Sequence, residues 1–137
     1  GDTKSKESDY LEPLYQALTK CNIIPGQAIS SDISEKNGTA WLEAHSATFC
    51  RGVNYEKQVV IIDEAQNMSV PILKRVISRC YDNTKVIVLG CQAQTDIPIN
   101  RSGFKQLIDH MEGFEGYIKC ELPISYRGKL AMHIDKL

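Results

Sequence analysis

The sequence predicts an α/β fold in which a mostly parallel sheet is flanked by helices. Two short apolar runs, residues 59–62 and 86–89, are rich in β-branched side chains, which is typical of buried strands. Between them, residues 69–81 carry apolar side chains at helical spacing. A strand, a helix and a strand in this order form a βαβ unit, so the strands should be parallel and joined by a right-handed crossover.

The segments before this unit are expected to hold one helix and little sheet. Residues 9–21 repeat apolar side chains at helical spacing and predict a helix, in which Pro13 is tolerated only in an early turn. Turn signals within residues 22–38 predict a loop, and residues 39–44 could form a strand. Residues 1–8 are polar and are expected to be disordered.

The segments after the unit complete the α/β pattern. A helix is expected after Ser102, a third strand over residues 117–122 and a closing helix over residues 130–137. We therefore expect a single, partial domain over residues 1–137. A chain of 137 residues with 42% hydrophobic content can supply its core.

Composition argues against several classes of protein. The net charge of −1 gives no global field that would attract nucleic acid or a membrane. No stretch approaches the ~20 apolar residues of a membrane span, and the polar N-terminus carries no signal peptide. The 5 cysteines form no close pair, so we expect reduced thiols rather than disulfides or a zinc site. These features predict a cytoplasmic protein with no membrane partner.

Polar residues follow each predicted strand. In an open parallel sheet, ligands bind beyond the carboxyl ends of the strands, so these residues should lie along one edge. They are Asp63 and Glu64 after the first strand, Gly90, Cys91, Gln92 and Gln94 after the second, and Ser125, Tyr126 and Arg127 after the third. Carboxylates, amides and a guanidinium in one crevice suit a magnesium–phosphate ligand, whereas a solvated strand-to-helix turn is the simpler interpretation of the acids.

Several motifs resemble those of the PhoH-like ATPases, which are relatives of superfamily 1 helicases. Residues 60–67, V-I-I-D-E-A-Q-N, resemble the Walker B segment of that family, and residues 86–96 resemble its next strand and sensor motif. Residues 122–127, L-P-I-S-Y-R, resemble its late arginine motif. Shorter similarities lie at residues 10–15, at Arg51-Gly52 and at Ser102-Gly103.

The resemblance implies a P-loop NTPase fold of the RecA-like type that binds ATP with Mg²⁺ and hydrolyses it. Asp63 would hold the Mg²⁺, and Glu64 would activate or orient the attacking water. Gln94 would sense the γ-phosphate, and Arg127 would stabilise charge in the transition state. A surface ion pair is the simpler interpretation of Arg127.

Nucleotide-binding roles are implied for three further residues, which are Gln66, Gly90 and Arg51. Gln66 would couple the γ-phosphate to conformation, although it could also only cap its own helix. Arg51 would contact phosphate or a neighbouring subunit. The resemblance also implies RNA as a partner and a homo-oligomer as an assembly state.

Two departures from the family pattern bear on activity. No G-x-x-x-x-G-K-[ST] loop occurs, so we expect the first strand and the P-loop to be missing and the chain to be the C-terminal part of a longer protein. Cys91 stands where the family has its sensor Asp, and a thiol carries no fixed charge unless its pKa falls well below ~8.5. The isolated chain is therefore expected to be inactive.

Two alternatives remain open. The missing loop and Cys91 favour a degenerate, non-catalytic NTPase-like module that serves as a binding or assembly partner. A receiver-like or other doubly wound domain with an unrelated acidic site would also fit the strand pattern.

A basic cluster, expected to be a solvated helix face, consists of Lys74, Arg75, Arg79 and Lys85.

Overall fold

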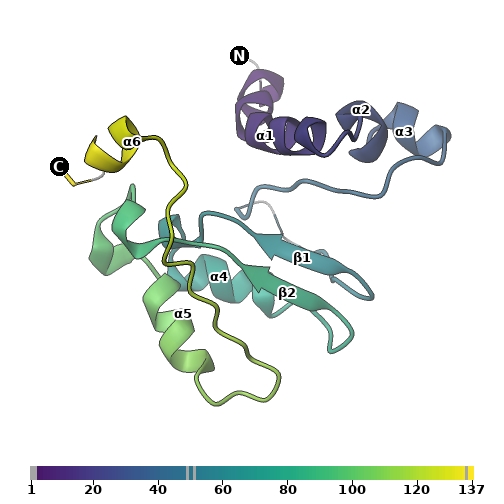
Figure 1. The fold of residues 1–137 in the computed structure, drawn as a ribbon. Helices are drawn as coiled ribbons and strands as arrows, with labels where there is room; N and C mark the ends of the chain where they lie inside the picture. Colours follow the sequence, from purple (N-terminus) through teal and green to yellow (C-terminus); the bar gives the residue numbers. More distant parts are fainter. Residues whose placement is uncertain (1–2, 49, 51, 135) are drawn as a thin grey trace. The chain divides into compact units, whose positions relative to one another are not determined.

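The computed structural model describes residues 3–48, 50, 52–134 and 136–137, which form two units. The amino-terminal unit covers residues 1–52 and the carboxy-terminal unit covers residues 53–137. Figure 1 shows the helices of the first unit and the two strands of the second.

The amino-terminal unit is helical. Its elements are α1 (Thr3–Lys20), α2 (Pro25–Ala28) and α3 (Asp32–Lys36). Helix α1 begins at Thr3, earlier than the predicted start at residue 9, and Pro13 therefore lies in its interior rather than in an early turn. Leu18, on the last turn of α1, and Ala28 of α2 are buried and anchor the unit.

Two short helices occupy residues 22–38, where the sequence predicts a loop. Pro25 sits in the first turn of α2, where its missing N–H costs nothing. Ser31 caps α3 in a reciprocal capping box with Ser34, whose buried hydroxyl also donates to the Ile29 carbonyl at 2.7 Å. The strand predicted at residues 39–44 is wrong in extent, because only Leu42 pairs, in an isolated bridge with Ile29.

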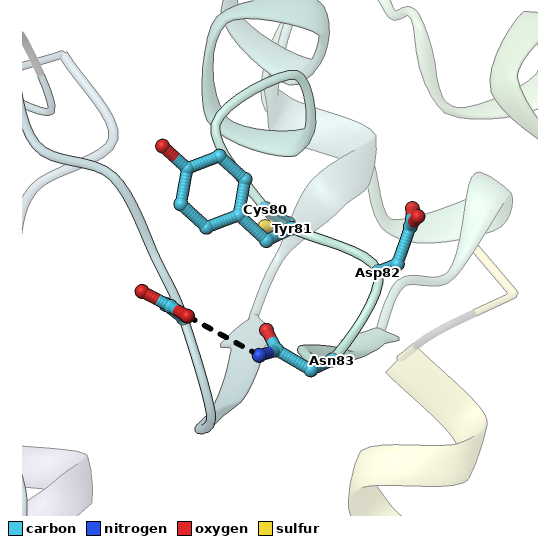
Figure 2. Close-up of a pocket in the computed structure, with 5 residues that line it drawn as sticks. Cys80, Tyr81, Asp82 and Asn83 are labelled. Carbon is cyan, nitrogen blue, oxygen red and sulfur yellow. Dashed lines mark hydrogen bonds between the residues drawn. The ribbon is translucent and has the colours of Figure 1, made fainter.

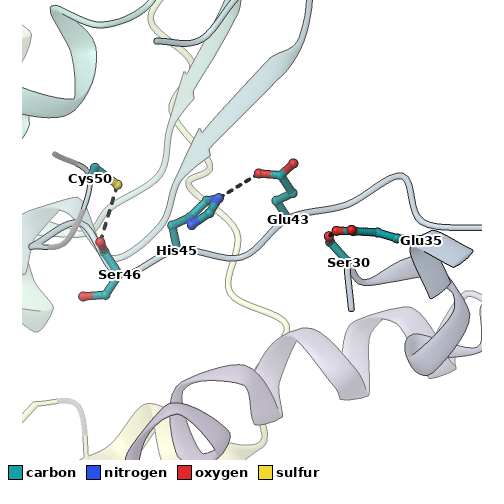
Figure 3. Close-up of polar contacts among 6 residues, drawn as sticks. All are labelled: Ser30, Glu35, Glu43, His45, Ser46 and Cys50. Carbon is teal, nitrogen blue, oxygen red and sulfur yellow. Dashed lines mark hydrogen bonds and ion pairs between the residues drawn. The ribbon is translucent and has the colours of Figure 1, made fainter. Parts of the chain in front are cut away.

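Local polar contacts lie both at α3 and in the segment that follows it (Figure 3). The His45 Nε2 lies 2.9 Å from the Glu43 carboxylate, and the Cys50 thiol donates to the Ser46 carbonyl at 3.4 Å. The Ser30 hydroxyl donates to the Glu35 carboxylate. Each contact joins residues close in sequence, so these bonds fix turns rather than long-range packing.

The carboxy-terminal unit contains the predicted βαβ arrangement. Strands β1 (Val59–Ile62) and β2 (Lys85–Val88) are parallel, with Val59 opposite Lys85 and Ile62 opposite Val88. Figure 1 shows them as adjacent arrows pointing the same way. The connecting helix and those that follow are α4 (Val70–Ile77), α5 (Phe104–Met111) and α6 (Lys129–Ile134), with 3₁₀ turns η1 (Ala65–Asn67), η2 (Gln92–Gln94) and η3 (Ile99–Arg101). The prediction of an α/β fold with parallel strands is confirmed.

The two faces of this sheet differ in burial. Ile62 of β1 is buried, as are Leu73 and Val76 of α4, and α5 packs against α4 and η1. On the other face, large apolar side chains are 38 to 60% exposed, and these are Val59, Ile61, Ile87 and Leu89. The prediction of strands buried on both faces is therefore wrong for one face, because the described residues of the carboxy-terminal unit leave it exposed.

The third strand predicted at residues 117–122 is not formed. This segment has no regular secondary structure, and Ile118 and Leu122 are 82% and 91% exposed. It runs as coil between α5 and α6 in Figure 1. Its alternation of apolar and polar residues suits a strand, but a strand forms only where a neighbour supplies hydrogen bonds, and none of the described strands pairs with it.

Candidate functional site

The candidate site lies at the carboxyl ends of β1 and β2. Asp63 and Glu64 follow β1 directly, and Gly90 and Cys91 follow β2 after Leu89. The strands are parallel and in register, so both groups stand at the same edge of the sheet. The ladder extends past the strands, because the Leu89 N–H donates to the Ile62 carbonyl at 2.8 Å and the Ala65 N–H donates to the Leu89 carbonyl at 2.9 Å.

Glu64 adopts a constrained backbone conformation at this edge. Its φ of 53° and ψ of 39° lie in the left-handed region, which costs energy for a residue with a Cβ. The Asp63 carboxylate accepts the Glu64 N–H at 2.9 Å, and the next residue, Ala65, is fully buried. These contacts hold the turn, so both carboxylates stay exposed beside the strand end.

The side chain of Gln66 connects the two loops of the site. It is 2% exposed, and its amide makes three hydrogen bonds. The Nε2 donates to the Glu64 carboxylate at 2.6 Å and to the Gln94 carbonyl at 3.2 Å, while the Oε1 accepts the Cys91 N–H at 3.1 Å. A buried amide is costly unless it is bonded in this way, so Gln66 fixes the loop after β2 against the loop after β1.

Arg127 reaches the same site from the far end of the chain. With the Gln94 amide oriented so that its oxygen faces the guanidinium, this oxygen accepts from Nη1 at 2.8 Å and from Nη2 at 3.3 Å. The Arg127 N–H also bonds the Ser125 hydroxyl at 3.4 Å, within the turn that presents the guanidinium. The structure therefore brings Arg127 to the site although the predicted third strand does not form.

A second pair of residues joins the two loops and was not anticipated from the sequence. The Asn67 Nδ2 donates to the Asp96 carboxylate at 3.2 Å, and the Asp96 N–H donates to the Asn67 Oδ1 at 2.7 Å. The Thr95 hydroxyl adds a third bond between the same two loops, because it donates to the Gln66 backbone carbonyl at 3.4 Å. The only signal in the sequence is that both residues follow strands at the same sheet edge.

Gly90 and Gly103 allow this close packing. A Cβ on Gly90 would lie 2.9 Å from the Gln66 Oε1 and 2.9 Å from the Phe104 Cζ. A Cβ on Gly103 would lie 2.4 Å from the Val70 backbone nitrogen. Gly90 is therefore required by the packing of the loop itself, whatever ligand the loop contacts.

The acidic groups suit a divalent cation held mainly by a phosphate ligand. One Asp63 oxygen accepts the Glu64 N–H, and the other makes no hydrogen bond with the described residues. Within those residues, no group of three His, Cys, Asp or Glu side chains could hold a metal alone. Mg²⁺ commonly uses one or two carboxylates together with phosphate oxygens and water, so the exposed Asp63 fits this mode.

Arg51 lies outside the described residues. Cys91 is exposed, and its backbone rather than its thiol makes the bond to Gln66.

A hollow in the surface lies at the opposite, amino-terminal ends of the strands (Figure 2). It has a volume of about 400 Å³ and is lined by Glu56 and by residues 80–83. The Asn83 amide donates to the Glu56 carboxylate at 3.4 Å, and burial raises the pKa of the Cys80 thiol. None of the predicted site residues lines this hollow, so it is separate from the candidate site.

The fold and the site define an α/β protein with a polar cluster at the carboxyl edge of parallel strands. Residues 1–134 match the family described as PhoH-like protein, and the chain belongs to that family. Every helix in the described part of the chain is too short or too polar to cross a membrane.

The chain is similar to several named relatives over most of its length. It is 33% identical to a PhoH-like protein of Synechocystis sp. over 123 residues, which are 89% of this chain and 36% of that protein. It is 30% identical to the PhoH-like protein of Bacillus subtilis, covering 89% of this chain and 37% of the relative. Protein PhoH of Escherichia coli is 31% identical over 84% of this chain and 31% of its own length. The chain thus spans about a third of these relatives, and no solved structure matches it.

Proposed function

We propose that this chain supplies the magnesium-binding and γ-phosphate-sensing half of an ATP site in a PhoH-like ATPase. The hydrogen-bonded series Glu64–Gln66–Gln94–Arg127 at the carboxyl edge of the sheet carries the proposal. Ligands of open parallel sheets bind at this edge, and carboxylate, amide and guanidinium groups suit a metal-bound polyphosphate.

Each group has a role that its position supports. Asp63 would hold Mg²⁺, which would neutralise phosphate charge when bound. Glu64, fixed by its left-handed turn, would orient a water and accept its proton. Arg127 would stabilise negative charge on the terminal phosphate, and its bond to Gln94 supports the proposed role of that amide in sensing the γ-phosphate.

Gln66 would transmit the state of the phosphate between loops. Its amide bonds both Glu64 and the loop that carries Gln94, so a shift of either loop must break or lengthen a bond to it. Gly90 and Arg51 are proposed as further nucleotide contacts. The cytoplasm is the proposed compartment, which the five free thiols support.

We also propose that a P-loop and an additional strand complete this sheet in the whole protein. Three observations support the proposal. In the described part of the chain the sheet has two strands, one of its faces is exposed, and the alternating segment 117–122 pairs with neither strand. Parallel sheets are normally covered on both faces, and a P-loop would supply most of the contacts that bind the phosphates.

The non-catalytic alternative is favoured by one observation. The exposed thiol of Cys91 stands where the family resemblance expects a carboxylate, which removes a fixed negative charge from the sensor loop. In that case the chain would serve as a binding or assembly module, with RNA or a second copy of the chain as proposed partners.

The experiment measures Mg²⁺-dependent ATP turnover and binding of a fluorescent ATP analogue by the complete protein. Glu64→Gln should lower turnover by at least about a hundredfold and leave ATP binding within about twofold, because it removes only the proton acceptor. Glu56→Gln, on an exposed acid at the opposite end of the strands, is the matched control. ATP binding without turnover in the unaltered protein would favour the non-catalytic module, and equal turnover in Glu64→Gln would overturn the assignment.

A further inference from the structure

The loop that follows β2, residues 91–96, is held by hydrogen bonds rather than by burial. All of its residues are exposed or half-exposed, and the turn η2 within it is closed by a bond from the Gln94 N–H to the Cys91 carbonyl at 3.1 Å. Apolar packing therefore cannot set the position of Gln94, whose side chain meets Arg127. The contacts that position this loop must be polar.

Both ends of the loop are tied to residues of η1. At its start, the Cys91 N–H donates to the buried Gln66 amide oxygen at 3.1 Å. At its end, the Asp96 N–H donates to the Asn67 Oδ1 at 2.7 Å, and the Asp96 carboxylate accepts from the Asn67 Nδ2 at 3.2 Å. Gln94 lies between these two attachments. Two residues of extended chain span about 7 Å, so a shift of Asp96 is passed on to Gln94.

Asn67 is the fixed member of its pair with Asp96. It ends η1, whose other residues, Ala65 and Gln66, are buried, and its N–H donates to the Glu64 carbonyl at 2.9 Å. Helix α5 packs against the same turn. The Asn67 amide presents a donor and an acceptor side by side, so it bonds the backbone and the carboxylate of Asp96 at once. This arrangement fixes the orientation of the loop as well as its distance.

We propose that the Asn67–Asp96 pair is a clamp that positions Gln94 against Arg127, which makes Asn67 and Asp96 positioning residues of the proposed ATPase. The effect on turnover rests on that proposed function, whereas the clamp itself is a property of the two loops. When the clamp opens, Gln94 loses its attachment at one end of the loop, and Arg127 loses an acceptor held in place.

Four variants of the complete protein test the clamp. Asn67→Ala removes both bonds, and Asn67→Asp places a second carboxylate against Asp96. Asp96→Asn keeps both bonds without the charge. The swap, Asn67→Asp with Asp96→Asn, rebuilds both bonds with the side-chain donor and acceptor exchanged. The matched control is Asn100→Ala, which removes an exposed amide that lies nearby and outside the pair.

Hydrogen–deuterium exchange, resolved to single residues by mass spectrometry, reports on the clamp without ATP. Protection of the amide at position 96 should fall about tenfold in Asn67→Ala and in Asn67→Asp, as loss of a hydrogen bond predicts. Protection should stay within about twofold of the unaltered protein in Asp96→Asn, in the swap and in the control. A swap variant as poorly protected as Asn67→Ala would overturn the clamp, whatever the protein does with ATP.

Mg²⁺-dependent ATP turnover then tests the positioning role. Asn67→Ala should lower kcat by about tenfold, because a displaced Gln94 leaves Arg127 poorly oriented, and the swap should restore it. The KM for ATP should stay within about twofold, since Asp63 is untouched. Unchanged kcat in an Asn67→Ala protein that has lost its protection would overturn the positioning role. An unaltered protein without turnover would overturn the proposed ATP site instead, and protection at position 96 would still decide the clamp.

Discussion

The Gln94 side chain and the Arg127 guanidinium are hydrogen-bonded across 33 residues of sequence, with the Gln94 oxygen 2.8 Å from Nη1. This contact joins the loop after β2 to the exposed segment before α6. It ties the segment that carries Arg127 to the candidate site.

Arg127 and Gln94 should act as a unit in ATP hydrolysis by the complete protein. Arg127→Ala should lower turnover by about a thousandfold, since an arginine on the terminal phosphate commonly contributes that much. Gln94→Ala should cost less, and the double variant should be close to Arg127→Ala alone because the two residues share one function. Additive losses, measured as kcat/KM, would show that the observed bond has no part in turnover.

Gln66→Leu should destabilise the carboxy-terminal unit by about 1–3 kcal/mol, because it leaves the Cys91 N–H without its acceptor. Urea unfolding followed by circular dichroism measures the change. Gln58→Leu, an exposed amide just before β1, should stay within about 0.5 kcal/mol. Equal stability of the two variants would mean that the buried amide contributes nothing.

Gly90→Ala should destabilise the fold by about 1–3 kcal/mol, since its methyl group would overlap Gln66 and Phe104. Gly128→Ala is the matched control, because a Cβ there meets nothing within 4 Å. Thermal unfolding of both variants measures the difference. A neutral Gly90→Ala substitution would mean that the loop has room to move, and the packing described around it would be wrong.

Thiol reactivity should divide the cysteines into two groups. Cys21, Cys91 and Cys120 are exposed and should react quickly with iodoacetamide, whereas the buried Cys50 and the half-buried Cys80 should react slowly. Mass spectrometry of digested protein, sampled over time, assigns each rate. Fast alkylation of Cys50 in the folded chain would contradict its burial.

Burial of Cys80 also predicts a pH dependence of stability. Because its folded pKa is raised above the ordinary value of 9.0, the folded state keeps a proton that the unfolded state has lost. Its contribution to stability is therefore complete below about pH 9 and is lost as pH rises through the folded pKa. Urea unfolding between pH 8 and pH 10 should show a smaller decline in Cys80→Ala than in the unaltered chain, and identical declines would exclude the effect.

The sequence predicts those parts of the fold that depend on local pattern. The strands at residues 59–62 and 86–89 and the helices after Ser69 and Ser102 follow from periodicity and caps, and the structure contains all four within a few residues. Segment 117–122 has an equally clear pattern but no pairing partner, and pairing is a non-local property. The order of the predicted strands led us to expect Gln94 and Arg127 close together. They are close in the structure, although the third strand predicted at residues 117–122 does not form.

The bonds that shape the site were less accessible to sequence reasoning. Gln66 could be expected near the phosphate, but its three partners depend on how tightly the loops approach, which Gly90 permits. The reciprocal hydrogen bonds of Asn67 and Asp96 form only if both loops are positioned within hydrogen-bonding distance of each other. Such detail depends on side-chain packing, which periodicity does not encode.

The absence of free volume around Gly90 has a mechanical consequence. Gln66 of η1 and Phe104 of α5 both pack against Gly90, since a Cβ there would lie 2.9 Å from an atom of each. Phe104 opens α5, which packs against η1, so the buried Gln66 amide and the start of that helix share one contact point on the loop after β2. We expect a shift of the Gln66 amide to alter the packing of α5, because both depend on the space left at Gly90.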